Sequence, residues 1–222
     1  ISDTPMYTLG DKQFAFGPVV RELEFIRVAF DEIVWLGFDR IADCENPIFD
    51  EIKDVHIKII PVKPIGGKGL LKKIGVILAA PLLALKIWRL IANAVIVHTR
   101  GPSSPAFIAM LFAYINKHKI WWNKYAGNWM QENPPYLYGL QKKVLLKLNQ
   151  THVTFNGFWK NQPSHCVSFE NPCLYDADLD KGKTTASNKN FEGDLELVFI
   201  GRLEEEKGVQ RILTMLKEQR FD

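Results

Sequence analysis

Near the end of the chain, an apolar stretch leads directly into a glycine and two cationic side chains. Residues 195–200 are Leu-Glu-Leu-Val-Phe-Ile, and Gly201, Arg202 and then Lys207 follow them. The pattern predicts a strand, a turn and the start of a helix. Helix N-termini favour anions, and arginine and lysine add charged hydrogen-bond donors. We therefore expect Gly201, Arg202 and Lys207 to bind a nucleotide diphosphate.

Polar residues and glycines also follow three predicted strands, at 94–97, 119–125 and 152–155. In a parallel sheet, ligands bind in the crevice at the carboxyl ends of the strands. His98 and Arg100 follow the first of these strands and are candidates for chemistry, although a histidine simply hydrogen-bonded at the sheet edge fits equally well. The candidates for ligand binding after the other two strands are Tyr125, Gly127, Asn128 and Asn156. Tyr125 and Trp129 have rings suited to stacking on a sugar or a base, whereas Trp121 and Trp122 are expected in the core.

Residues 3–17 are predicted to form a long exit loop after a first strand that ends at Ile1-Ser2. Long connections at this edge are often functional, and a plain surface loop is the alternative. The loop contributes four binding candidates, Gly10, Lys12, Gln13 and Phe16. It contains no GxGxxG, so we predict no dinucleotide fingerprint.

Short apolar runs alternate with helical patterns along most of the chain. Strands are predicted at 32–38, 56–60, 94–97, 119–125, 152–155 and 165–169, and helices at 19–30, 70–91, 104–116 and 135–149. Alternation of this kind predicts an α/β fold with a doubly wound, Rossmann-like parallel sheet. Residues 1–175 are expected to form this domain, 176–194 a polar linker or loop, and 195–222 the start of a second domain.

Composition excludes few functions. The chain has 222 residues, 47% apolar, with a net charge of +3, which is too weak to argue for nucleic acid. Three cysteines without CxxC spacing fit a reducing, cytoplasmic compartment. The five histidines are scattered, so no metal site is expected. The chain begins without Met or a secretory signal, and we expect both ends to be trimmed.

Segment 68–91 combines a long apolar run with basic flanks. Its uninterrupted apolar part, 74–85, is too short to span a bilayer. One interpretation is a helix that lies on an anionic membrane surface through Lys72, Lys73 and Lys86. The other is a crossover helix packed on the sheet, with solvated lysines.

The segment 198–209, Val-Phe-Ile-Gly-Arg-Leu-Glu-Glu-Glu-Lys-Gly-Val, closely resembles the first strand and turn of the second domain in glycosyltransferase family 4. Residues 95–102 are similar to the fourth-strand region of that family, and residues 155–157 and 168–173 to the end of its first domain. The resemblance implies the GT-B architecture, of which 1–175 would be the first half. It also implies a retaining enzyme whose first domain binds the acceptor and whose second binds the nucleotide-sugar donor.

The resemblance assigns roles to several residues. Arg202 and Lys207 match the pair that neutralises the donor diphosphate as it leaves, without a metal or other cofactor. The candidates at 10–16 and 125–156 become acceptor-binding residues. Arg100 stands where many members carry a histidine or an acidic residue. The paired glutamates of the family would lie beyond Asp222, so the chain alone is expected to be inactive.

The expected function is sugar transfer from a nucleotide sugar to a glycan or lipid-linked acceptor in bacterial polysaccharide biosynthesis. The expected location is the cytoplasm, peripherally on the inner membrane face through 68–91, and no nucleic-acid partner is expected. Two alternatives stay open: a GT-B sugar-nucleotide epimerase, and a non-catalytic sugar- or nucleotide-binding module.

Overall fold

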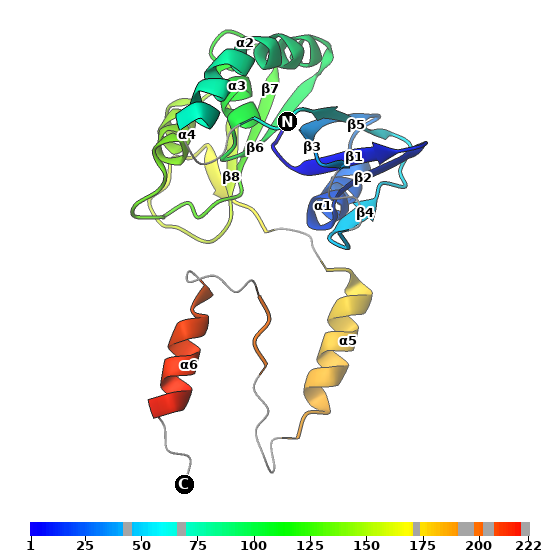
Figure 1. The fold of residues 1–222 in the computed structure, drawn as a ribbon, viewed down its shortest axis with the longest axis vertical. Coiled ribbons are helices and arrows are strands. Elements are labelled where there is room, and N and C mark those ends of the chain that lie inside the picture. Colours follow the sequence, from blue (N-terminus) through cyan, green and yellow to red (C-terminus); the bar gives the residue numbers. More distant parts are fainter. Residues whose placement is uncertain (42–45, 66–69, 171–173, 191–197, 202–206, 219–222) are drawn as a thin grey trace. The chain divides into compact units, whose positions relative to one another are not determined.

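The computed structural model describes residues 1–41, 46–65, 70–170, 174–190, 198–201 and 207–218, without the side chains of 70–74, 76 and 77. The chain divides into two compact units, Ile1–Cys173 and Leu174–Asp222. The first unit contains two sheets and their covering helices (Figure 1).

The first sheet is mixed and has the order β4-β2-β1-β3-β5. Its strands are β1 (Pro5–Leu9), β2 (Lys12–Phe16), β3 (Ile33–Asp39), β4 (Phe49–Glu51) and β5 (Ile57–Val62). β1, β3 and β5 run parallel, whereas β2 pairs antiparallel with β1 and β4. The prediction of a long loop at 3–17 is therefore wrong, because residues 5–16 form a hairpin that turns at Gly10, where φ is +59°.

Helix α1 (Gly17–Arg27) covers this mixed sheet. Apolar residues at helical spacing on α1, including Val19 and Leu23, pack with Met6 and Trp35 in one hydrophobic cluster. The helical periodicity expected at 19–30 is confirmed up to Arg27.

The second sheet is entirely parallel, with the order β6-β7-β8-β9. Its strands are β6 (Ile96–Gly101), β7 (Ile120–Tyr125), β8 (His152–Phe155) and β9 (Cys166–Ser168), and its helices are α2 (Leu70–Asn93), α3 (Ser104–Phe112) and α4 (Tyr136–Lys147). All three helices contribute to one cluster with the strands, which contains Ile87, Met110, Leu145, Trp121 and Val153. The apolar runs from which these elements were predicted contribute the buried residues of this cluster. Pro81 lies within α2, which continues past it.

Ile1 and Ser2 connect the two sheets at the level of the backbone. Ile1 N donates to His98 O at 2.8 Å, and Arg100 N donates to Ile1 O at 2.9 Å. Ser2 N donates to Leu36 O on β3 at 3.0 Å. Residues 1–2 thus lie between β3 and β6, as Figure 1 shows, and link the two sheets.

The second unit has two described helices, α5 (Asp176–Ser187) and α6 (Val209–Glu218). Residues 176–187 are helical where a linker or loop was predicted. α5 has no buried residue and begins with a local bond from Tyr175 N to Asp178 Oδ2 at 3.0 Å. Of the strand predicted at 195–200, residues 195–197 lie outside the described residues, and 198–200 are not in a strand.

The α/β class is confirmed, but the prediction of a wholly parallel sheet holds only for β6–β9. β2 and β4 make the other sheet mixed because the chain turns back at Gly10 instead of crossing over. Within the described ranges, every helix is too short or too polar to cross a membrane.

Candidate functional site

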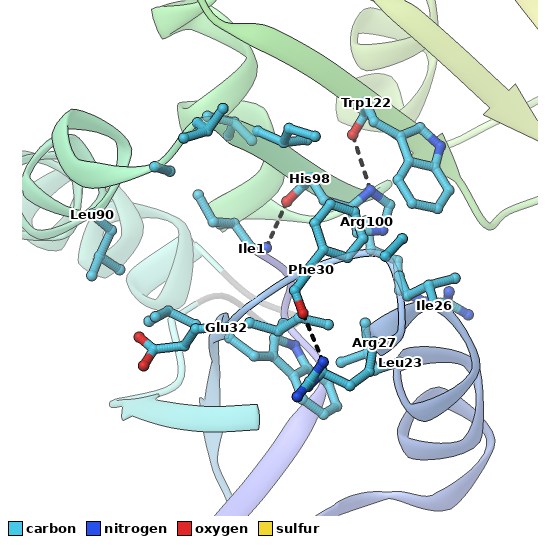
Figure 2. A pocket seen from close by; sticks show the side chains of 18 of the residues that line it. Ile1, Leu23, Ile26, Arg27, Phe30, Glu32, Leu90, His98, Arg100 and Trp122 are labelled. Atoms are coloured by element: carbon cyan, nitrogen blue, oxygen red, sulfur yellow. Dashed lines mark hydrogen bonds between the residues drawn. The ribbon is translucent and has the colours of Figure 1, made fainter. Parts of the chain in front are cut away.

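A cavity of about 950 Å³ lies between α1, the first residues of β3 and β6, and the end of α2 (Figure 2). Its walls are largely apolar and include Leu23, Ile26 and Leu90. Polar groups gather at one end, where Arg100 and His98 face α1. The volume and the mixture of apolar walls with a few polar groups are typical of small-molecule pockets.

The polar end is organised by one carboxylate. Glu22 Oε2 accepts from Arg100 Nη1, and Glu22 Oε1 accepts from Lys124 Nζ, each at 2.6 Å. The side chains are 3% exposed for Glu22, 0% for Lys124 and 19% for Arg100. Glu22, Arg100 and Lys124, called the Glu22 cluster below, therefore place two cations around one carboxylate with little water.

The two strands deliver both cations to the same face because β6 and β7 pair with Arg100 opposite Lys124. Residues alternate between faces along a strand, so Thr99 and Asn123 point to the opposite face. There they hydrogen-bond each other at 2.7 Å. Burial lowers the pKa of Lys124, and its contact with Glu22 opposes that shift.

His98 lies beside the Glu22 cluster but is poorly suited to act as a base. Its Nδ1 lies 3.0 Å from Trp122 O. A carbonyl only accepts, so Nδ1 carries the proton and Nε2 is the acceptor. Burial lowers the pKa of His98 to about 3. The neutral ring therefore binds a proton weakly near pH 7, which does not support a catalytic role.

Trp122 and Trp129 lie in surroundings other than those predicted for them. Trp121 is buried in the core as predicted. Trp122 is half-buried, lines the cavity and donates from Nε1 to Thr154 Oγ1 at 2.8 Å. Tyr125 and Trp129 are both buried and meet edge to face at 5.2 Å, so protein covers the rings that were expected to stack on a sugar.

The remaining candidates of the parallel sheet lie at its carboxyl edge and do not line the cavity. Gly127 approaches Pro102 so closely that an added Cβ would lie 3.1 Å from Pro102 Cδ. Asn128 Oδ1 accepts from Met130 N at 3.1 Å and holds a turn. Asn156 Oδ1 is buried and has no hydrogen-bond partner among the described residues. Asn156 is therefore the candidate at this edge whose polar group the described residues leave unsatisfied.

The four candidates from 3–17 are tied to the mixed sheet. Gly10 is at the exposed hairpin turn, and Lys12 Nζ pairs with Glu51 Oε2 at 3.0 Å. Gln13 Oε1 accepts from Ile59 N at 2.9 Å, and Phe16 is the residue immediately before α1. The structure thus separates these residues from Arg100 and from Asn156.

In the second unit, Lys207 is exposed and stands two residues before the start of α6. Gly208 between them has φ +75°, and an added Cβ there would lie 3.0 Å from Arg211 Nη2. The guanidinium of Arg211 is thus a second cation near the helix N-terminus. Gly201 is exposed, and Arg202 lies outside the described residues.

Sequence reasoning missed Glu22 and Lys124. Glu22 lies between Val20 and Leu23 and three residues after Val19, on the buried side of α1. A carboxylate among inward-facing apolar residues requires a cationic partner, and this signal was available in the sequence. Lys124 was hidden because it belongs to an apolar strand that predicted only burial.

Chemically, the polar end of the cavity offers the guanidinium of Arg100, the carboxylate of Glu22 and the neutral ring of His98 as hydrogen-bonding groups. No group of three or more histidine, cysteine, aspartate or glutamate side chains is arranged to hold a metal among the described residues. Comparisons with protein-family models, with curated proteins and with solved structures found no match for the chain.

Proposed function

We propose that the chain belongs to a GT-B glycosyltransferase that moves a sugar from a nucleotide-sugar donor to a glycan or glycolipid acceptor. The observation that carries the proposal is the helix entry at Lys207, Gly208 and α6. An exposed lysine and the guanidinium of Arg211 lie at the mouth of a ten-residue helix whose first turn contains no acid. Free N–H groups and cations at a helix start favour a phosphate group.

The resemblance of 198–209 to the donor-domain turn of glycosyltransferase family 4 supports the same assignment. In this proposal Gly201, Arg202 and Lys207 bind the diphosphate and stabilise the negative charge that develops as it leaves. Fixed cationic donors can supply that stabilisation without a metal. The sugar then passes to an acceptor bound by the first unit.

For the acceptor, we propose binding at the carboxyl edge of β6–β8, where Gly127, Asn128 and Asn156 follow their strands. The buried, unpartnered Oδ1 of Asn156 supports this edge, because a hydroxyl of a sugar would satisfy it. The close approach of Gly127 to Pro102 keeps the neighbouring turn compact. A cytoplasmic location is part of the proposal, since nucleotide sugars are the co-substrates.

Calorimetric titration of the chain with nucleoside diphosphates tests the donor site, and the matching monophosphates serve as weaker ligands. Lys207→Ala should weaken diphosphate binding about tenfold to a hundredfold, the usual value of one hydrogen bond to a charged group. Lys217→Ala removes the same charge at the far end of α6 and should leave binding unchanged. Equal affinity for mono- and diphosphates, or equal effects of the two substitutions, would contradict the assignment. A screen of nucleotide sugars for hydrolysis or transfer then tests the reaction.

A further inference from the structure

The charge of the chain is very unevenly distributed. Residues 55–169 contain 15 lysines and arginines but a single acid, Glu132. The other residues contain 13 basic and 24 acidic side chains. The modest net charge of +3 therefore conceals a strongly basic part, which contains β5, the parallel sheet and helices α2, α3 and α4. Such a part attracts anionic surfaces.

Within this basic part, α2 has an apolar face that no described residue covers. Leu78, Leu82 and Leu85 are 74%, 76% and 48% exposed. Their spacing of four and then three residues places them on one side of the helix. Four residues further on, exposed Arg89 continues the same side. We call these four residues, with exposed Lys86 beside them, the outer face of α2.

The opposite side of α2 already accounts for the folding of this helix. Leu83, Ile87 and Ile91 are buried in the core cluster of the parallel sheet. Leu78 and Leu82 of the outer face therefore contribute little to the packing of the unit, and Leu85 is about half covered. Apolar side chains that are exposed next to one another on one helix side, unlike singly scattered ones, are typical of binding surfaces.

More apolar and basic groups adjoin the outer face where α3 meets α2. The rings of Trp88 and Phe112 lie 5.1 Å apart, and Leu111 and Ile115 near them are exposed. Lys119 Nζ donates to Ala94 O at 2.6 Å just beyond the end of α2. Lys86 and Arg89 thus lie beside an apolar stripe, which is the composition of helices that lie at a membrane interface.

We propose that the outer face of α2 docks on an anionic lipid bilayer, with its leucines inserted among the acyl chains and Lys86 and Arg89 at the phosphates. Nucleic acid would match the charge but not the leucines, and an apolar protein partner would not need the excess of cations. The proposal rests on exposure and charge, and it holds whether or not the chain transfers a sugar.

Vesicle flotation tests the proposal with the intact chain. We expect binding to vesicles of phosphatidylcholine with phosphatidylglycerol, much weaker binding to phosphatidylcholine alone, and partial release at high salt. The double variant Leu78→Ser, Leu82→Ser should bind at least about tenfold more weakly, because two inserted apolar side chains become polar. Lys86→Gln with Arg89→Gln should weaken binding by a similar factor and reduce its salt dependence.

Val28→Ser and Val55→Ser alter exposed apolar side chains elsewhere in the same unit and should leave binding unchanged. Circular dichroism and thermal melting establish that each variant is folded. If the leucine variant does not fold, the charge variant still decides the question. Absent binding, equal binding to both vesicle types, or full retention by either double variant overturns the proposal. The proposal is also overturned if nucleic acid displaces the vesicles and the leucine variant binds that nucleic acid as well as the wild type does.

Discussion

Replacing Glu22 by glutamine should destabilise the first unit strongly. Glu22 makes two contacts of 2.6 Å to cations, and at an effective dielectric constant of about 20 each contributes roughly 6 kcal/mol of Coulomb attraction. Desolvation of the three groups offsets much of this attraction. Glutamine keeps the shape of the side chain but leaves Lys124 and Arg100 without that carboxylate in a site with little water. Breaking a buried ion pair in this way costs about 3–5 kcal/mol.

Urea denaturation at pH 7 measures the effect. Glu32→Gln is the matched control, because Glu32 pairs with Lys58 at the surface, where both side chains are largely exposed. That substitution should cost about 1 kcal/mol or less. The double variant Glu22→Gln, Lys124→Met should recover part of the loss, since no ammonium group is then buried beside an amide. The reasoning fails if Glu22→Gln costs no more than Glu32→Gln, or if the double variant is as unstable as the two single variants added together.

Two further predictions concern His98 and Gly157. The folded pKa of His98, about 3, lies below its ordinary value of 6.5, so the unfolded chain binds the proton first and stability falls as pH drops below about 6.5. Between pH 7 and pH 5 this protonation should remove about 2 kcal/mol from the free energy of unfolding. Urea denaturation of the wild type and of His98→Gln at both pH values measures the contribution of His98, because the variant lacks it. Gly157→Ala should destabilise by about 1–3 kcal/mol, because Gly157 has φ +92° and an added Cβ would lie 3.0 Å from Trp159 Nε1. The control is Gly75→Ala, because Gly75 is a helical glycine with nothing within 4 Å of an added Cβ. Thermal melting compares the two variants, and equal melting temperatures would contradict the prediction.

The parts of the fold that were predictable from the sequence are those with a continuous or periodic apolar signal. β3, β5, β7 and β8 were found because their apolar runs are buried. α2 was found by its long apolar composition. Two segments, the β1–β2 hairpin and α5, lack such a signal. Residues 5–16 mix polar and aromatic residues around Gly10, and α5 has no buried face and depends on local bonds such as that of Asp178.

The candidate site was predictable only in part. Strand ends identified Arg100 and Asn156, because the carboxyl edge of a parallel sheet collects polar residues. The pairing of Arg100 with Glu22 was not predictable from strand ends, since it depends on how α1 packs beside a second sheet. Likewise, sequence alone did not show that Tyr125 and Trp129 cover each other in the core.

The sequence separation between Glu22 and its cationic partners has a consequence during synthesis. Its cationic partners come 78 and 102 residues later, at Arg100 and Lys124. A ribosome that adds about 5–20 residues per second needs roughly 5–20 s to make the residues between Glu22 and Lys124. For most of that interval neither cation has been made, and Arg100 precedes Lys124 by 24 residues. Both ion pairs of Glu22 can therefore form only after β7 has been made, later than every strand of the mixed sheet.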